Sequence, residues 1–324
     1  MPPKKKPVVT ILVPMYNEEL VLPLLFDELN RVTGGITDCD FVYLFVDDGS
    51  KDASVSIVKN YASQDSRVRY LALSRNFGKE KALLAGFDHV DSDAVIVIDA
   101  DLQDPPELIP EMIALWKQGY QDVYAKRINR RGETWLKKVT STMYYRLLQT
   151  TTRIEIQPDT GDFRLLDRAC IDALKQFRET ERNTKALFSW IGFRKYAIEY
   201  DRAPRAAGKT KFNYFRLFNL AIDGLTSFTT TPLRVAGVLG FLVSLIAFIY
   251  LLQVIIKNII YGPDVSGYPS TMATILFLGG VQLMSLGIIG EYIGKIFNET
   301  KTRPTYLVGE NNLNTDPARG SRKK

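Results

Sequence analysis

An apolar run meets two carboxylates spaced one residue apart in the stretch Val95-Ile96-Val97-Ile98-Asp99-Ala100-Asp101-Leu102-Gln103-Asp104-Pro105-Pro106-Glu107. Its four β-branched residues predict a strand that is buried on both faces. The carboxylates then lie at the C-terminal end of that strand, where open α/β sheets bind ligands. Such oxygen ligands suit Mg²⁺ or Mn²⁺, which complete their shell with water and substrate phosphates. The alternative is that Asp101 or Asp104 caps a helix that begins at the two prolines.

The chain around this stretch has the pattern of an α/β domain. From Val8 to about Tyr200, short apolar runs alternate with amphipathic segments. Right-handed crossovers would make the first strands mostly parallel, with helices on both faces of the sheet. Strands are predicted at residues 8–13, 41–46, 68–73 and 94–98, and helices are predicted to start near Glu18, Asp52, Lys79 and Pro106.

Polar residues follow the first two strands as well. Tyr16 could stack on a planar base, and Asp48 could accept hydrogen bonds from a base or a ribose. Taken singly, Asn17 reads as a helix cap and residues 47–49 as a turn. Because Asp99 joins them at the same edge of the sheet, the combination favours a nucleotide site.

Other motifs and the composition narrow the function further. Residues 75–79, Arg-Asn-Phe-Gly-Lys, stand at a helix start that suits an anion, or form only a turn. The sequence has no G-x-G-x-x-G and no P-loop motif, which disfavours a dinucleotide fold and a P-loop enzyme. His89 is the single histidine, so neither a Ser-His-Asp triad nor a histidine-rich zinc site can form. Cys39 and Cys170 provide no disulfide framework, which agrees with a reducing compartment.

The charge distribution suggests a membrane rather than nucleic acid as the partner surface. The net charge of +6 favours an anionic membrane surface or phosphorylated substrates, although it also serves solubility. Because the basic residues are scattered and no nucleic-acid-binding motif accompanies them, we expect no nucleic acid partner.

The C-terminal half holds two long uncharged segments. Residues 235–256 and 270–290 contain no charged side chain, and each is long enough as a helix to cross roughly 30 Å of hydrocarbon. We therefore predict two transmembrane helices, at about 235–257 and 270–291. Lysine and arginine flank this pair but are absent from the link between its members, so both termini and the polar domain are predicted to face the cytoplasm.

The remaining segments complete the predicted organisation. Residues 1–7 form a short basic leader without the apolar core of a signal peptide. A tail follows from residue 297, and its part from 311 to 324 is polar, basic and predicted to be disordered. Glycines in and after the second span, at positions that include Gly290 and Gly294, leave room for close helix approach within the hairpin or between protomers. We expect a homo-oligomer.

Taken together, residues 14–18, 47–50, 75–79 and 99–107 resemble family 2 glycosyltransferases of the polyprenyl-phosphate branch, which includes bactoprenol glucosyltransferases and dolichol-phosphate mannose synthases. The resemblance extends from Val8 to Val308, and residues 290–295 and 301–306 also match. It implies a GT-A fold, which is Rossmann-like with a mostly parallel sheet, over residues 8–212. Interfacial helices (213–232) and a two-helix transmembrane hairpin (233–296) would follow.

The resemblance also implies roles for individual residues. Asp99, Asp101 and Gln103 would meet the metal and the diphosphate, with Ala100 in the same donor site. Relatives often have Glu-Ser-Lys where this chain has Lys209-Thr210-Lys211, which leaves open which lysine contacts phosphate. The nucleoside would be held by Pro14, Tyr16, Glu18, Val46 and Asp48, and donor or acceptor phosphates by Arg127, Arg205, Lys209 and Lys211.

The expected reaction is inverting, metal-dependent transfer of a hexose from a nucleotide sugar to a polyprenyl phosphate such as undecaprenyl phosphate. Asp162 would act as a base or orient the acceptor, unless it is only a turn residue. Residues 213–231 would form an amphipathic helix in the membrane interface, or a helix packed on the catalytic domain. Pocket shape sets the sugar, and UDP-glucose is our first expectation over mannose or a modified pentose.

The sequence disfavours two other functions. A processive polysaccharide synthase usually has a Gln-X-X-Arg-Trp motif, and no tryptophan here follows an arginine. A non-catalytic scaffold or lipid translocator is disfavoured by the intact acidic motif and by the small number of spans.

Overall fold

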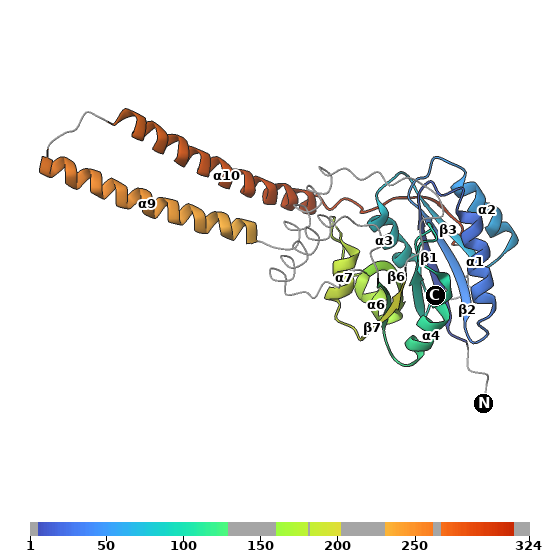
Figure 1. Cartoon of the computed structure of the whole chain (residues 1–324). Helices are drawn as coiled ribbons and strands as arrows, with labels where there is room; N and C mark the ends of the chain where they lie inside the picture. Colours follow the sequence, from blue (N-terminus) through green and yellow to red (C-terminus); the bar gives the residue numbers. More distant parts are fainter. Residues whose placement is uncertain (1–5, 129–159, 181, 202–230, 262–266, 314–324) are drawn as a thin grey trace, which may run out of the picture. The chain divides into compact units, whose positions relative to one another are not determined.

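A computed structural model of the chain describes residues 6–128, 160–180, 182–201, 231–261 and 267–313 (Figure 1). The chain divides into two compact units. One contains the sheet and includes the tail from Arg303 onward, and the other contains the two long C-terminal helices.

Within the described residues, eight strands form one sheet, with the order β7-β5-β6-β4-β1-β2-β3-β8 (Figure 1). The first four strands pair in parallel, as predicted, and β5 pairs in parallel with β7, whereas β6 and β8 run antiparallel to their neighbours. The strands are β1 (Val8–Met15), β2 (Asp40–Asp47), β3 (Val68–Leu73), β4 (Ala94–Val97), β5 (Asp122–Arg127), β6 (Thr160–Asp167), β7 (Lys195–Tyr200) and β8 (Val308–Asn311).

Helices cover both faces of this sheet because its central strands are apolar on both sides. In β1, Ile11 packs in one core cluster and Leu12 in the other, which is the pattern expected of a fully buried strand. The first cluster includes α1 (Leu22–Gly34), α2 (Ser54–Gln64) and α4 (Ile109–Lys117), which follows the short 3-10 helix η1 (Pro106–Leu108). The second includes α3 (Lys79–His89), α6 (Arg168–Leu174) and α7 (Thr184–Trp190).

The predicted helix starts are correct at Lys79 and Pro106, close at Asp52, and wrong at Glu18, since α1 begins at Leu22. Residues between β1 and α1 form a loop instead, because their backbone amides donate to side chains of the β2–α2 loop and of Ser54, the first residue of α2. Asn17 therefore caps no helix: its backbone has a left-handed φ of 56°, and its side chain accepts a hydrogen bond from the Lys51 amide.

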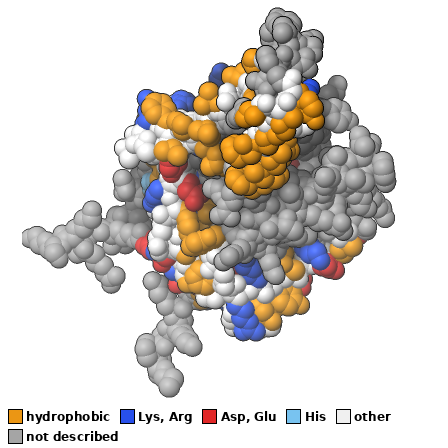
Figure 2. All heavy atoms as spheres, turned by 90° about the vertical axis from the view of Figure 1, so that its left-hand side faces the viewer, with side chains coloured by type: hydrophobic (Ala, Val, Ile, Leu, Met, Phe, Trp, Pro, Cys, Tyr) orange, Lys and Arg blue, Asp and Glu red, His pale blue; other side chains and the backbone are white. Residues whose placement is uncertain are grey.

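Two long helices, α9 (Thr231–Tyr261) and α10 (Tyr268–Thr300), lie where the two spans are predicted and contact each other (Figure 1). Their large hydrophobic side chains are exposed, and Figure 2 shows such side chains gathered on the face toward the viewer. Among the described residues, one stretch is long and apolar enough to cross a membrane, Phe277–Thr300, and a shorter apolar helix covers Val235–Tyr250. The length and hydropathy of α10 therefore support the second predicted span, whereas the first span remains a prediction.

The tail corrects one expectation. Disorder was predicted from Asn311 onward, yet Asn311 ends β8, which pairs with β3. The Asn312 side chain accepts a hydrogen bond from the Tyr70 amide at 2.7 Å and donates one to the Val68 carbonyl at 3.2 Å. Leu313 packs against the second core cluster. Composition missed this segment because its ordering comes from the edge of β3 rather than from its own apolar content.

Candidate active site

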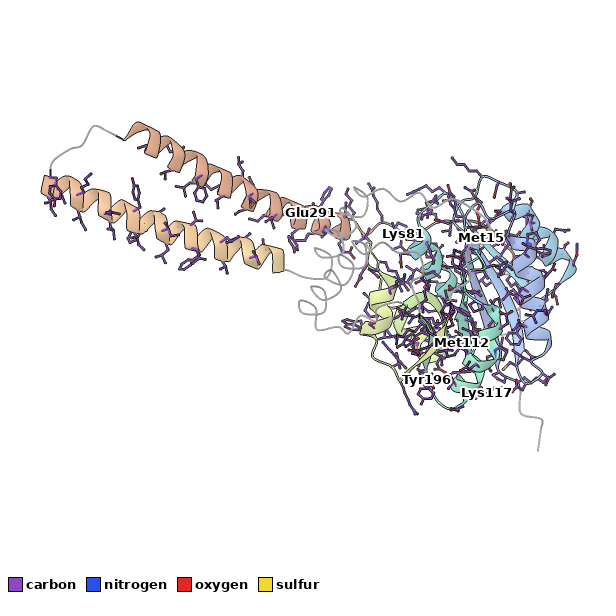
Figure 3. All side chains as sticks on the ribbon, viewed as in Figure 1. Met15, Lys81, Met112, Lys117, Tyr196 and Glu291 are labelled. Atoms are coloured by element: carbon purple, nitrogen blue, oxygen red, sulfur yellow. The ribbon has the colours of Figure 1, made fainter. Side chains whose placement is uncertain are left out.

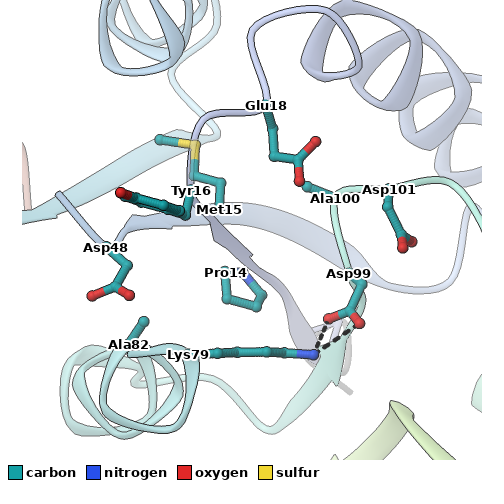
Figure 4. A pocket seen from close by; sticks show the side chains of 10 residues that line it. All are labelled: Pro14, Met15, Tyr16, Glu18, Asp48, Lys79, Ala82, Asp99, Ala100 and Asp101. Carbon is teal, nitrogen blue, oxygen red and sulfur yellow. Dashed lines mark hydrogen bonds and ion pairs between the residues drawn. The ribbon is translucent and has the colours of Figure 1, made fainter. Parts of the chain in front are cut away.

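A pocket of about 290 Å³ lies at the carboxyl ends of β1, β2 and β4, beside the start of α3 (Figure 4). This is the edge where an open α/β sheet is expected to bind ligands. It brings together seven of the predicted site residues. The lining consists of Pro14, Met15, Tyr16, Glu18, Asp48, Lys79, Ala82, Asp99, Ala100 and Asp101.

Two loops that interlock by hydrogen bonds build one wall of the pocket. The Asn17 amide donates to Ser50 Oγ at 2.9 Å, and the Glu18 amide donates to Ser54 Oγ at 2.8 Å. Glu19 reciprocates, since its carboxylate accepts a hydrogen bond from the Ala53 amide at 2.9 Å. The backbone that follows Tyr16 is therefore fixed, and Tyr16, which is 41% exposed, faces the pocket.

Asp48 connects the second loop to the third. Its carboxylate accepts hydrogen bonds from the backbone amides of Phe77 at 2.7 Å and Gly78 at 2.9 Å. These amides at the start of α3 were predicted to bind an anion, and the anion they bind is Asp48. Burial raises the pKa of the Asp48 carboxyl, while these amides oppose the rise. Asp47, in contrast, binds the amides of its own turn, as predicted for a turn residue.

Lys79 holds two carboxylates that come from different strands. Its Nζ lies 2.6 and 2.8 Å from the two oxygens of Asp99 (Figure 4) and also donates to Asp162. Burial alone would lower the pKa of Lys79, but the two negative charges outweigh it and raise the pKa. Burial likewise opposes ionisation of Asp162, yet the charges of Lys79 and Lys185 prevail and lower its pKa. Asp99 behaves differently, because burial raises its pKa.

Asp162 lies within β6 rather than in a turn, so the alternative of a turn aspartate is wrong. Asp162 is 6% exposed, and its Oδ1 has no hydrogen-bond partner within the described parts of the chain. A buried carboxylate oxygen without a partner is costly unless a ligand uses it.

Asp101 and Asp104, the other carboxylates of the acidic motif, do not cap the helix that follows it. The N-cap residues of η1 and α4 are Pro105 and Leu108 and not Asp101 or Asp104, so the capping alternative is wrong. Asp101 lines the pocket, and one of its oxygens accepts the Gln103 amide at 3.2 Å. Gln103 itself is 7% exposed and is not among the lining residues.

Asp104 organises a second cluster, at the end of β5 and β7. Its buried carboxylate accepts a hydrogen bond from the Tyr200 hydroxyl. Arg127 Nε donates to the same hydroxyl at 3.3 Å, and Arg127 Nη2 lies 3.8 Å from Asp104. Burial, together with the Asp104 charge, raises the pKa of Tyr200 to about 12, so the hydroxyl stays protonated at neutral pH.

Several predicted site residues are not brought to the pocket. Val46 is fully buried in the second core cluster, so its side chain faces α3 and its neighbours rather than the lining. Arg205, Lys209, Lys211 and residues 213–230 lie outside the described residues, so their predicted roles stay predictions. Two residues of the site are not predicted from the sequence. Lys79 lies in the motif of residues 75–79, but the motif assigns it no role of its own. Tyr200 belongs to no motif.

The donor set suits a divalent cation only in part. No group of three His, Cys, Asp or Glu side chains that could enclose a metal occurs among the described residues. Mg²⁺ and Mn²⁺ do not need one, since they are often bound by one or two carboxylates plus substrate phosphates. Asp101 at the pocket and Asp99 beside it fit that requirement, although Asp99 is paired with Lys79.

Comparison with known proteins shows which families the two parts of this chain match. Residues 10–174 match Glycosyl transferase family 2, and residues 231–296 match the GtrB C-terminal hairpin. An uncharacterized glycosyltransferase of Synechocystis is 48% identical over 93% of this chain and 94% of its own length. The bactoprenol glucosyl transferase of Shigella phage SfX is 44% identical over 93% of this chain and 98% of its own.

Solved structures are more distant. A glucosyl-3-phosphoglycerate synthase from Mycobacterium tuberculosis, in complex with Mn²⁺, UDP and its product, is 16% identical with a TM-score of 0.45. The likeness covers 66% of this chain and 76% of the synthase chain.

Proposed function

The chain belongs to glycosyl transferase family 2, and we propose that it transfers glucose from UDP-glucose to a polyprenyl phosphate with inversion at the anomeric carbon. One observation carries the proposal. A relative named bactoprenol glucosyl transferase matches 93% of this chain at 44% identity, so the likeness spans both the pocket and the hairpin.

The pocket suits a nucleotide sugar by its chemistry. Tyr16 offers a ring for stacking on the base, and Asp48, at the same end of the pocket, offers a carboxylate close to it (Figure 4). The diphosphate would then extend toward Asp101, with the sugar between it and Asp162. In this arrangement the acceptor phosphate approaches from the side of β6.

In the proposed reaction, an acceptor phosphate oxygen attacks the anomeric carbon, and the bond to the nucleoside diphosphate breaks on the opposite side. A phosphate monoester has a second pKa of about 6, so the nucleophile is largely anionic at neutral pH and needs no strong base. Asp162 would therefore serve to orient the acceptor. Arg127, held by Tyr200 and Asp104, would bind a phosphate with its remaining donors.

We propose Asp101 as the main protein ligand of a Mg²⁺ or Mn²⁺ ion, with Asp99 beside it. When bound, such an ion would offset the charge that grows on the departing diphosphate. Gln103 would contribute through its backbone amide, which donates a hydrogen bond to the Asp101 carboxylate.

The lipid acceptor gives the hairpin a purpose. A polyprenyl phosphate keeps its chain in the bilayer and its phosphate at the interface, so an enzyme that uses it must be held there. We propose that α9 and α10 are this anchor and that the catalytic unit faces the cytoplasm, in line with the basic residues that flank the pair.

The experiment is a transfer assay with the purified full chain, undecaprenyl phosphate and a panel of nucleotide sugars. We expect a lipid-linked sugar with UDP-glucose, and little product with GDP-mannose or with UDP-pentose. Product from another donor would correct the sugar alone. Chain extension beyond one sugar, or no transfer with any donor, would contradict the proposal.

A further inference from the structure

Lys79 bridges the two sides of the candidate site. Asp99 follows β4 and stands at the pocket, whereas Asp162 belongs to β6 and is not among the lining residues. The Lys79 ammonium contacts both, and 41% of its side chain stays exposed because the stem lies along the pocket (Figure 4). In the described chain it is therefore a direct link between the donor pocket and Asp162.

The backbone that carries Lys79 is well constrained. Lys79 is the first residue of α3, and the preceding Gly78 is held through its amide by Asp48. Further along α3, a Cβ on Gly86 would stand 2.4 Å from Leu12 Cδ1, so the helix packs closely on β1. A helix anchored at both places fixes the backbone position from which the Lys79 side chain extends to the two carboxylates.

Charge explains why a cation is needed here. Asp99 and Asp162 together bring two negative charges to a site proposed to receive two anionic substrates, and Lys79 offsets one of them. Asp162 uses one oxygen on Lys79, and its other oxygen, Oδ1, is one of the buried side-chain atoms that have no hydrogen-bond partner among the described residues. Among the described residues, the other charged groups that act on this cluster are Glu80, Asp104, Arg127, Arg164 and Lys185.

We infer that Lys79 is a positioning residue, whose ammonium holds the Asp162 carboxylate so that Oδ1 faces the transfer site, with Asp99 as its second anchor. The inference rests on the proposed function. It predicts that Lys79 affects transfer through Asp162 rather than by its own contact with a substrate.

A double-mutant cycle tests this directly. Transfer would be measured for wild type, Lys79→Met, Asp162→Asn and the double variant, all as full-length protein in lipid nanodiscs with undecaprenyl phosphate. We expect each single change to lower kcat/KM by roughly 10- to 100-fold, the size of one charge-assisted hydrogen bond. The double variant should be within about threefold of Asp162→Asn, because coupled residues are not additive.

The matched control is Lys117→Met. Lys117 also forms an ion pair, with Asp38, but lies at the end of α4, away from the pocket residue Met15 (Figure 3). We expect its transfer rate to stay within about twofold of wild type, as for surface ion pairs in general. Lys79→Gln, which keeps a hydrogen-bond donor, replaces the methionine variant in the cycle if that variant does not fold.

Two results would overturn the inference. If the double variant loses the product of the two single losses, Lys79 acts independently of Asp162, as it would by contacting the donor itself. If Lys79→Met transfers normally, the ion pairs have no role in the reaction. Wild-type protein that transfers no sugar would instead contradict the proposed function, so the two failures are distinguishable.

Discussion

The Tyr306 hydroxyl donates a hydrogen bond of 2.8 Å to the carboxylate of Asp88, which stands near the C-terminal end of α3. Arg178 pairs with the same carboxylate at 2.7 Å, and the Tyr306 ring meets His89 edge-on. The tail therefore binds the catalytic sheet at the edge of β3 and the end of the helix whose first residue is Lys79.

Replacing Tyr306 by Phe should destabilise the catalytic unit. The change removes a half-buried hydrogen bond to a charged group, which costs about 1–2 kcal/mol of unfolding free energy. A lower thermal midpoint of the purified protein is the measurement. Tyr196→Phe is the control, because the Tyr196 ring is 41% exposed and packs on Tyr120. Equal midpoints for both variants would show that the tail contact adds no stability.

The tail also illustrates what the sequence could not predict. Strands β1 to β4 are recognisable because their own residues are apolar and β-branched, and the observed bounds differ from the predicted ones by at most two residues. β8 has the sequence Val-Gly-Glu-Asn and all four of its residues are exposed. Its order comes from pairing with β3, which local pattern cannot predict.

The same distinction applies to the site. The sheet-edge rule predicts that Asp48, Asp99 and Asp101 converge, because each follows or ends a parallel strand. The rule does not predict which groups these side chains bind. Asp48 bonds to backbone amides 29 and 30 positions away, and Lys79 meets Asp162 across 83 positions. Such pairings depend on loop geometry and on an antiparallel β6, and neither leaves a signal in the sequence.

Chelation should abolish transfer if Asp101 holds a divalent cation. EDTA should stop product formation and added Mg²⁺ or Mn²⁺ should restore it, while Asp101→Ala should lower turnover by at least about 100-fold, since metal stabilisation of a leaving group amounts to several kcal/mol. Asp27→Ala, at an exposed position of α1, is the control. Full activity in EDTA would exclude the metal role.

Tyr200 should make stability depend on alkaline pH. Folding raises its pKa from 10.0 to about 12, so the stabilisation is complete below pH 10 and is lost as the pH rises toward 12. Over that range the stability advantage of wild type over Tyr200→Phe should shrink by about 2 kcal/mol. Thermal midpoints of both proteins at several pH values measure it. A constant difference would mean that Tyr200 does not titrate as a buried phenol.

Gly49→Ala should loosen the pocket itself. Gly49 has a left-handed φ of 73°, and a Cβ there would stand 2.4 Å from the backbone carbon of Arg75, so the loop after β2 and the loop before α3 would have to separate. That separation breaks the Asp48 bonds to Phe77 and Gly78. We expect UDP affinity, measured by titration calorimetry, to fall by roughly tenfold or more, as for the loss of a hydrogen bond to a charged group.

The matched control separates crowding from backbone strain. Gly192 has a similar φ of 69°, but a Cβ there would meet nothing closer than 3.9 Å. Gly192→Ala should therefore lose about 1 kcal/mol of stability through its left-handed backbone and keep its affinity for UDP. If Gly49→Ala binds UDP as well as Gly192→Ala does, the contact between these loops does not set the donor pocket.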